Sequence, residues 1–281
     1  MNHELRTKLR GFLEDEFLSI WKVEVDNWDN PKTEPPKAPR PVLSKIVNEV
    51  IESMKVQCLV KTGISFPGWL DDPDKSTKDL IPLKNGLLDV NKLIEGYTES
   101  IDPKEFLIPH TPDFFSPVCL TYKFEGVDEL SIEGTNFGQV LRFAFPGPEG
   151  LKSRIVLQQF VGYLLSQDNT YNKFLLMTGQ GGNGKSVFLT VIKALLGAEN
   201  VASSPLDKIA DRFEASSYYD KLVNVIDEAS PKIEQRTLNQ LKRLTGGGDV
   251  RVEQKGKKAF FQANKCRFII TCNQIPQFQD L

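Results

Sequence analysis

The 281-residue chain is 40% hydrophobic and 26% charged, which is the composition of a globular protein with one large or two ordinary domains. No apolar run approaches the roughly 20 residues that cross a bilayer, and the charged N-terminal segment lacks the apolar centre of a signal peptide. The net charge of the whole chain, −2, gives no electrostatic reason to expect nucleic-acid binding. Basic residues are nevertheless concentrated in residues 242–267, which hold eight Lys or Arg against two acidic residues.

The four cysteines of the chain, Cys58, Cys119, Cys266 and Cys272, are scattered. None forms a C-x-x-C pair and no paired histidines accompany them, so the pattern argues against a zinc site. We expect buried, reduced thiols in a cytoplasmic protein.

Residues 1–62 are predicted to form a helical segment with a proline-rich connector. Residues 5–20 and 43–60 carry apolar residues at helical spacing. The apolar face of the second helix is expected to comprise Ile46, Val47, Val50, Ile51 and Met54. Between the two helices, the prolines of residues 31–41 predict an extended connector.

Residues 63–150 are rich in Pro, Gly and Asp, and we interpret them as an irregular α+β accessory region. Residues 83–90 (LKNGLLDV) have the Asn-Gly signature of a tight turn between two short strands. Residues 116–124 (SPVCLTYKF) are predicted to form a further strand.

Strands and helices alternate from residue 151 to residue 281, which predicts an α/β domain with helices on the faces of a sheet. The strands are expected at residues 174–178, 222–228 and 266–273. The first is so uniformly apolar that we expect it to be buried on both faces of a parallel sheet. Helices are expected at residues 154–165, 185–196 and 233–245.

The run GQGGNGKS at residues 179–186 matches the phosphate-binding pattern G-x-x-x-x-G-K-[ST]. Its glycines would let backbone N–H groups curl around a phosphate, and the following helix adds its N-terminal partial positive charge. We expect Lys185 to reach the β- and γ-phosphates of ATP and Ser186 to ligate Mg²⁺. A glycine-rich surface turn is the alternative, but the apolar strand before and the apolar helix after favour nucleotide binding. The predicted nucleotide-binding residues are Gly179, Gly181, Gly182, Asn183, Gly184, Lys185, Ser186 and Val187.

Polar residues follow the next two predicted strands. Asp227 and Glu228 come after an apolar strand, at the edge of the sheet where a ligand is expected. Asp227 is expected to hold Mg²⁺, and Glu228 to polarise the attacking water. Asn273, at the end of the following strand, would contact the γ-phosphate or the water. An ordinary acidic junction and a turn-forming asparagine are the alternatives.

The basic segment KGKK at residues 255–258 predicts the turn of a β-hairpin. Lys255, Lys257 and Lys258 would then stand at an exposed tip. Ammonium groups there suit a sequence-independent grip on single-stranded DNA, although a solvated lysine turn is the alternative.

In this order, the segments GQGGNGKS, VIDEA, LKRLTGGGDVRVEQKGKK and ITCNQIP resemble the superfamily III helicases, and among them the phage- and plasmid-type primase–helicases that include the poxvirus enzyme. The resemblance is specific over residues 179–276 and looser from residue 80. It implies an AAA+-like ring, usually hexameric, that moves single-stranded DNA by ATP hydrolysis in phage or plasmid replication. Lys185 and Ser186 would carry the Walker A roles, Asp227 and Glu228 the Walker B roles, and Asn273 the sensor role.

The chain departs from that family pattern in two respects. Eight residues follow Asn273, so we expect this chain to lack both the arginine finger that the family places beyond it and the sheet strand that would flank residues 174–178. We likewise expect no primase catalytic domain before the accessory region. We therefore expect a truncated product or half of a split gene, with single-stranded DNA, further copies of the chain and a primase domain or subunit as partners.

Two other functions stay open. The first is a nucleotide- and DNA-binding module with little ATP turnover. An arginine finger typically raises the rate of hydrolysis by about 10³–10⁵, so a chain that lacks one would hydrolyse ATP slowly. The second is a different P-loop enzyme such as a small-molecule kinase, against which the lysine hairpin argues.

Overall fold

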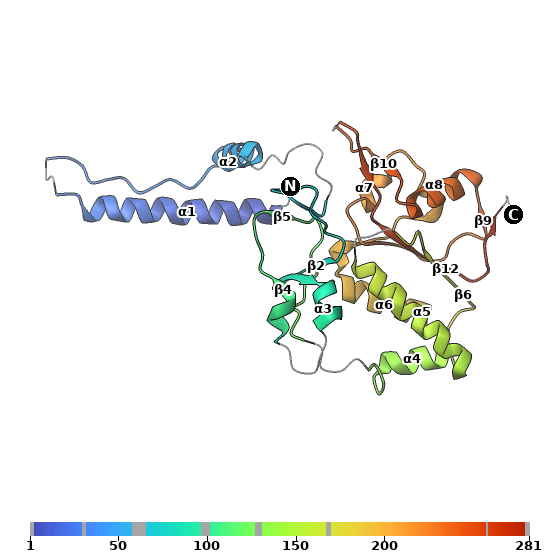
Figure 1. Ribbon diagram of the computed structural model, residues 1–281. Coiled ribbons are helices and arrows are strands. Elements are labelled where there is room, and N and C mark those ends of the chain that lie inside the picture. The colour runs from blue at the N-terminus through green and yellow to red at the C-terminus, as the bar shows by residue number, and fades with distance from the viewer. Residues whose placement is uncertain are drawn as a thin grey trace. The chain divides into compact units, whose positions relative to one another are not determined.

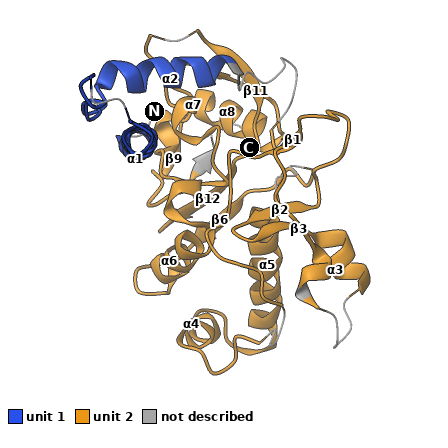
Figure 2. Cartoon of the chain, turned by 90° about the vertical axis from the view of Figure 1, so that its left-hand side faces the viewer, with its two compact units in different colours: residues 1–62 blue, residues 63–281 orange. Residues whose placement is uncertain are grey.

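The structure, a computed structural model, describes residues 3–29, 32–57, 66–96, 102–126, 131–166, 170–256 and 258–278. The chain divides into two compact units, Met1–Thr62 and Gly63–Leu281 (Figure 1, Figure 2). Within the described ranges, no helix combines the length and the apolar character that a bilayer crossing requires.

The first unit contains two helices, α1 (His3–Asp26) and α2 (Ser44–Gln57), and the described residues between them, 27–29 and 32–43, contain no helix or strand. Both were predicted, although α1 is longer than expected and residues 58–60 of the second predicted helix lie outside the described residues. Val42, Val47 and Ile51 form a small core against which α1 packs. Met54, expected on the same apolar face as Val47, is half exposed instead.

The centre of the second unit is a four-stranded parallel sheet in the order β6-β12-β8-β7. The strands are β6 (Leu175–Thr178), β7 (Val201–Ala202), β8 (Val223–Ile226) and β12 (Arg267–Cys272). The helices that pack on the sheet are α5 (Gly147–Leu165), α6 (Lys185–Leu196), α7 (Ala215–Tyr218) and α8 (Gln235–Thr245). This is the mixed α/β architecture that the alternating pattern predicts.

Each face of the sheet has its own hydrophobic core, because successive side chains of a strand point to opposite faces. On one face, Val225 and Ile269 belong to the same cluster as buried residues of α5 and α6. On the other face, Ile226 and Ile270 belong to a cluster with α7 and α8. The sheet is therefore held from both sides, and its strand ends are fixed in space.

The remaining elements are short. The small sheets pair β1 (Gly68–Trp69) with β5 (Phe114–Phe115), β2 (Leu80–Leu83) with β3 (Gly86–Asp89) and β4 (Leu107–Ile108), β10 (Asp249–Val252) with β11 (Phe260–Ala263), and β9 (Lys232–Ile233) with β13 (Gln277–Phe278). The other helical elements are α3 (Val90–Gly96), α4 (Asn136–Ala144) and the 3-10 turns η1 (Pro103–Phe106), η2 (Ala198–Asn200) and η3 (Leu206–Lys208). The β2–β3 hairpin confirms the turn predicted at residues 83–90.

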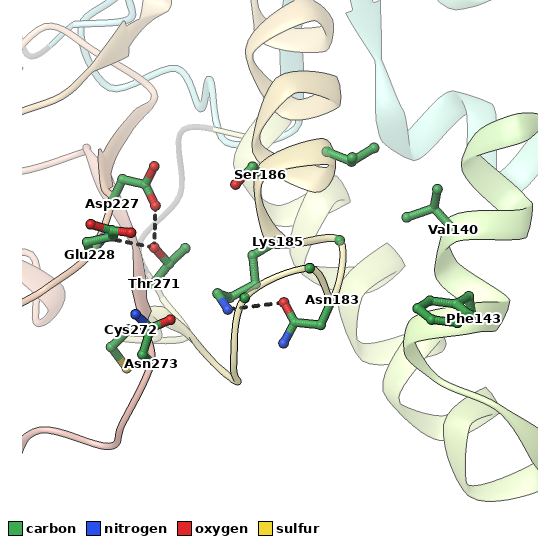
Figure 3. Close-up of a pocket in the computed structure, with 14 residues that line it drawn as sticks. Val140, Phe143, Asn183, Lys185, Ser186, Asp227, Glu228, Thr271, Cys272 and Asn273 are labelled. Carbon is green, nitrogen blue, oxygen red and sulfur yellow. Dashed lines mark hydrogen bonds between the residues drawn. The ribbon is translucent and has the colours of Figure 1, made fainter.

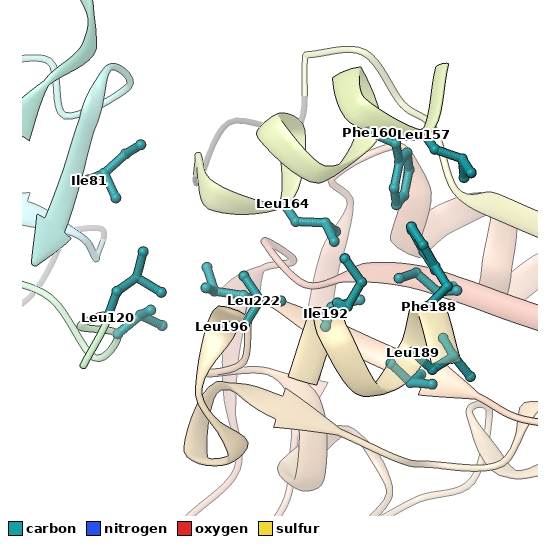
Figure 4. Close-up of a cluster of buried hydrophobic side chains, with 14 of the residues drawn as sticks. Ile81, Leu120, Leu157, Phe160, Leu164, Phe188, Leu189, Ile192, Leu196 and Leu222 are labelled. Atoms are coloured by element: carbon teal, nitrogen blue, oxygen red, sulfur yellow. The ribbon is translucent and has the colours of Figure 1, made fainter. Parts of the chain in front are cut away.

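The predicted boundary at residue 150 falls inside the second unit. Ile81 and Leu120, from the predicted accessory region, join the same core as Leu164 and Ile192 (Figure 4). Moreover, α5 begins at Gly147 rather than at residue 154, so one helix spans the expected boundary. The accessory region therefore shares its core with the parallel sheet.

The prediction of a strand at residues 116–124 is wrong. Leu120 makes an isolated bridge to Leu83, and its N–H donates to the Pro82 carbonyl at 2.9 Å. Because Pro82 has no N–H to donate in return, a regular ladder cannot form along this side of β2. Val118 and Leu120 are nevertheless buried, which explains the strand-like apolar pattern.

The burial expected for residues 174–178 is also wrong. In the sheet order, β6 lies at the edge beside β12. Its Leu175, Leu176 and Met177 are half-buried, and Thr178 is exposed. The expected thiol burial holds for Cys266 and Cys272, whereas Cys119 is exposed and Cys58 lies outside the described residues.

Leu164 offers a test of the shared core, because its side chain is 0% exposed at the point where α5 meets the sheet. We expect Leu164→Ala to lower the free energy of unfolding by about 2–5 kcal/mol, through lost burial and the remaining cavity. Leu151→Ala, at a half-exposed position of the same helix, should change it by about 0.5 kcal/mol or less. Urea unfolding followed by circular dichroism measures both, and equal effects would contradict the packing.

Candidate functional site

The loop of residues 179–186 connects β6 to α6, and its backbone conformation favours glycine at both ends. Gly179 and Gly184 have φ angles of +153° and +87°, which side-chain-bearing residues rarely adopt. An added Cβ would lie 2.0 Å from Asn183 Nδ2 at Gly179 and 2.9 Å from Val140 Cγ1 at Gly184. The positive φ angles therefore favour glycine at both ends of the loop, and at Gly184 a side chain would also crowd Val140 of α4 (Asn136–Ala144).

Lys185 is the first residue of α6, and its ammonium group bends back into the curve of the loop. It donates to the main-chain oxygens of Gly179 and Gln180, the latter at 3.2 Å, and to Asn183 Oδ1 at 3.0 Å (Figure 3). A positive charge is thus held by oxygen acceptors at the centre of the loop. An incoming anion would meet this charge together with the N–H groups of the first turn of α6.

Ser186 is the second residue of α6, and its hydroxyl lies on the side of the loop where Asp227 is found (Figure 3). Phe188, Leu189 and Ile192 of the same helix are buried in the core, which fixes the direction of its N-terminus. The hydroxyl oxygen and the Asp227 carboxylate are the hard oxygen ligands that Mg²⁺ prefers.

Asp227 and Glu228 follow β8, and Thr271 of β12 holds both. The Thr271 hydroxyl donates to Asp227 Oδ1 at 2.6 Å and accepts from the Glu228 N–H at 3.1 Å. Its main-chain oxygen accepts from the Ala229 N–H at 2.8 Å. Glu228 has a φ of +53°, a left-handed conformation that costs a non-glycine residue about 1–2 kcal/mol. The bonds from Thr271 offset that cost and orient the acidic pair.

The end of β12 also holds the glycine-rich loop. The Gly179 N–H donates to the Cys272 carbonyl at 3.2 Å, so one strand end contacts the loop on one side and the acidic pair on the other. Burial raises the pKa of the Cys272 thiol, against the opposing effect of the Lys185 charge, so the thiol stays protonated and uncharged. Asn273, directly after it, is exposed.

These elements line an open cavity of about 370 Å³ (Figure 3). The predicted site residues that line it are Gly181, Gly182, Asn183, Gly184, Lys185, Ser186, Val187, Asp227, Glu228 and Asn273. Gly179 is not in its wall and acts through the loop shape described above. The structure thus brings together three segments that the sequence singled out separately.

Four residues of the cavity wall were not predicted: Val140, Phe143, Thr271 and Cys272. The last two directly precede Asn273, so a closer inspection of that strand end would have found them. Val140 and Phe143 belong to α4, about forty residues before the loop, and no motif marks them. Sequence spacing alone therefore could not predict that these two residues line the cavity.

The predicted hairpin is present, since β10 and β11 pair antiparallel with Val252 opposite Phe260. Lys255 and Lys258 are exposed near its turn, whereas Lys257 lies outside the described residues. Phe261, on the strand leading away from the turn, is 70% exposed. None of these described side chains lines the cavity, so the hairpin is a separate surface.

Comparisons with known proteins find similar chains. A family model described as a family of unknown function (DUF5906) matches residues 177–280. The chain is 29% identical over 178 residues to the uncharacterized mitochondrial protein ymf21 of Marchantia polymorpha, covering 60% of this chain and 86% of that protein.

Two of the similar solved structures are of the NrS-1 C-terminal region. The apo structure of its residues 305–718 has a TM-score of 0.41 and 23% identity, over 51% of this chain and 35% of that chain. The A form apo structure of the C-terminal region has a TM-score of 0.40 and 20% identity, over 49% and 32%. The chain therefore spans about a third of the length of these structures.

Proposed function

We propose that this chain binds Mg²⁺-ATP in the cavity and hydrolyses it as an ATP-dependent DNA helicase or translocase of phage or plasmid replication. One observation carries the proposal: the Lys185 ammonium, the Ser186 hydroxyl and the Asp227–Glu228 pair line a single cavity beside a glycine-rich loop. The sequence spacing predicts this convergence, and the resemblance to superfamily III helicases supports the choice of reaction.

The residues present fit a nucleoside triphosphate and a magnesium ion. The curled loop and the N-terminus of α6 would bind the phosphates, with Lys185 donating to the β- and γ-phosphates. Ser186 and Asp227 would hold the metal, Asp227 being oriented by its hydrogen bond from Thr271. A bound Mg²⁺ ion supplies charge neutralisation at the transferred phosphoryl group.

Glu228 would orient and polarise the attacking water, since its carboxylate stands beside Asp227 at the cavity (Figure 3). Its main chain is bonded to Thr271, so the residue is held in place before substrate enters. Asn273 would contact the γ-phosphate or the water from the neighbouring strand end.

The lysines of the hairpin would grip single-stranded DNA, because exposed ammonium groups bind the phosphate backbone without regard to sequence. In the chain the hairpin is followed by β12, whose Thr271 and Cys272 line the cavity. We further propose self-association into a ring and cooperation with a primase domain or subunit, as the family resemblance implies.

The experiment measures Mg²⁺-ATP affinity, single-stranded DNA affinity and DNA-stimulated phosphate release, for the parent chain and for a variant with Lys255, Lys257 and Lys258 changed to alanine. The parent should bind both ligands. Losing three phosphate contacts should weaken DNA binding by about 10- to 100-fold near 0.1 M salt and lower the salt slope by about 2, with ATP affinity unchanged.

A variant with Lys92, Lys104 and Lys123 changed to alanine is the control, because it removes the same charge from exposed positions elsewhere. It should keep most of the DNA affinity. If the two triple variants lower DNA affinity equally, the hairpin lysines are those of an ordinary solvated turn. A parent chain that binds no ATP would refute the central proposal.

A further inference from the structure

We propose that α4 forms the base-binding wall of the cavity, with the Phe143 ring stacking on the base of the bound nucleoside triphosphate. This inference rests on the proposed function, because it takes the phosphates to lie in the loop of residues 179–186. It adds the location of the base and the feature of the base that is recognised.

The cavity has two chemically different ends (Figure 3). Asp227 and Glu228 line one end, Val140 and Phe143 of α4 line the other, and the glycine-rich loop lies between them. A nucleoside triphosphate has the same division, with charged phosphates at one end and a flat aromatic base at the other. With the γ-phosphate beside Asp227, the base is directed toward α4.

Phe143 is 77% exposed, the highest exposure of any large apolar side chain in the part of the chain that the structure describes. The free energy falls when a flat partner covers an aromatic ring that would otherwise be exposed to water. Nucleic-acid bases stack on such rings whatever their identity, since each base has a π-face. Phe143 therefore offers the base a partner at the apolar end of the cavity.

The position of the wall is fixed by an adjacent face of α4, which is anchored in the core. The Phe137 ring stacks on Phe188 of α6 with centroids 6.5 Å apart, and Leu141 is buried. The Thr135 side chain caps the helix by accepting from the Gly138 N–H at 3.0 Å. Residues one turn apart share a helix face, so this anchoring turns the adjacent face toward the loop.

The composition of the wall limits what it recognises. Val140 and Phe143 are the α4 residues that line the cavity, and neither has a side chain that can form hydrogen bonds. The wall would therefore respond to the area of the base ring rather than to its donor and acceptor pattern. We expect ATP and GTP to bind with similar affinity, and CTP and UTP to bind more weakly.

A second cavity, of about 450 Å³, offers the base a competing location. It shares Val140, Asn183, Gly184 and Lys185 with the first, but it extends along β6 to Val156 of α5 instead of to Phe143. Val156 is 56% exposed, so a larger side chain there would fill this space without disturbing the core. The two locations are therefore separable by substitution.

The test compares binding of Mg²⁺-ATP and of Mg²⁺-tripolyphosphate by calorimetry in the parent chain and in Phe143→Ala. Loss of the stacking partner should weaken ATP binding by about 10- to 100-fold and leave tripolyphosphate binding unchanged. Phe261→Ala, which removes a similarly exposed ring outside the cavity, is the matched control and should alter neither.

The possible outcomes separate this inference from the proposed function. If the parent binds neither ligand, the phosphate site itself fails. If it binds both but Phe143→Ala leaves ATP affinity unchanged, the phosphate site stands and the base-binding wall is refuted. Val156→Trp should leave ATP affinity unchanged, and a loss there with none in Phe143→Ala would place the base beside β6.

Discussion

Replacing Lys185 with alanine is expected to weaken Mg²⁺-ATP binding by about 10- to 100-fold, the range for hydrogen bonds to charged groups. The ammonium group is the positive charge held within the loop by Asn183 Oδ1 and two main-chain carbonyls. Turnover should fall by a further factor of roughly 10²–10³, because the same group would stabilise the charge that develops on the transferred phosphoryl group. Fluorescent-nucleotide titration and phosphate release measure the two effects.

Lys193→Ala is the control for this substitution. Lys193 lies on the same helix in its last turn, and its exposed side chain is outside the cavity wall. The substitution removes the same charge from α6 and should leave ATP affinity and phosphate release unchanged. If Lys185→Ala folds like the parent and binds ATP with parental affinity, the loop does not bind phosphate.

The elements around the site were predictable where one local signal determines the structure. The helix predicted at residues 185–196 matches α6, because a glycine with a φ of +83° stops it at Gly197. The strands β8 and β12 were identified because their apolar runs are short and end in polar residues. Local composition decides such elements before any long-range contact forms.

The errors arose where long-range contacts decide the outcome. Residues 116–124 have the composition of a strand, yet their neighbour β2 contains Pro82, which cannot complete a ladder. The apolar residues of β6 resemble those of a strand buried on both faces, although Leu175, Leu176 and Met177 are only half-buried. Neither the pairing partner of a strand nor its burial can be obtained from the composition of one segment.

The candidate site shows the same division. Motif spacing was sufficient to identify the loop, the acidic pair and Asn273, which line one cavity. The position of Val140 in the cavity wall depends on how α4 packs on α6 through Phe137 and Phe188. Such packing involves side chains far apart in the sequence, so the apolar end of the cavity was visible only in the structure.

The two residues of the acidic pair are expected to have different roles, one in binding and one in turnover, because their carboxylates have different surroundings. Asp227 accepts a hydrogen bond from the Thr271 hydroxyl, which leaves its second oxygen available to a metal ion. The Glu228 side chain has the same access to the cavity, but only its main-chain N–H is bonded to Thr271. Its carboxylate is therefore suited to a water molecule that approaches the γ-phosphate.

Glu228→Gln is accordingly expected to leave Mg²⁺-ATP affinity within about threefold of the parent and to slow hydrolysis by roughly 10²–10⁴, the usual contribution of a general base. Glutamine keeps the size and the main-chain bonds and removes the charge that polarises water. Single-turnover hydrolysis with single-stranded DNA measures the rate, relative to the parent. Glu234→Gln, the same change at an exposed position six residues on, should have no effect. A Glu228→Gln variant that hydrolyses ATP at the parental rate would assign the water to another residue, and a lost affinity would assign Glu228 to the metal.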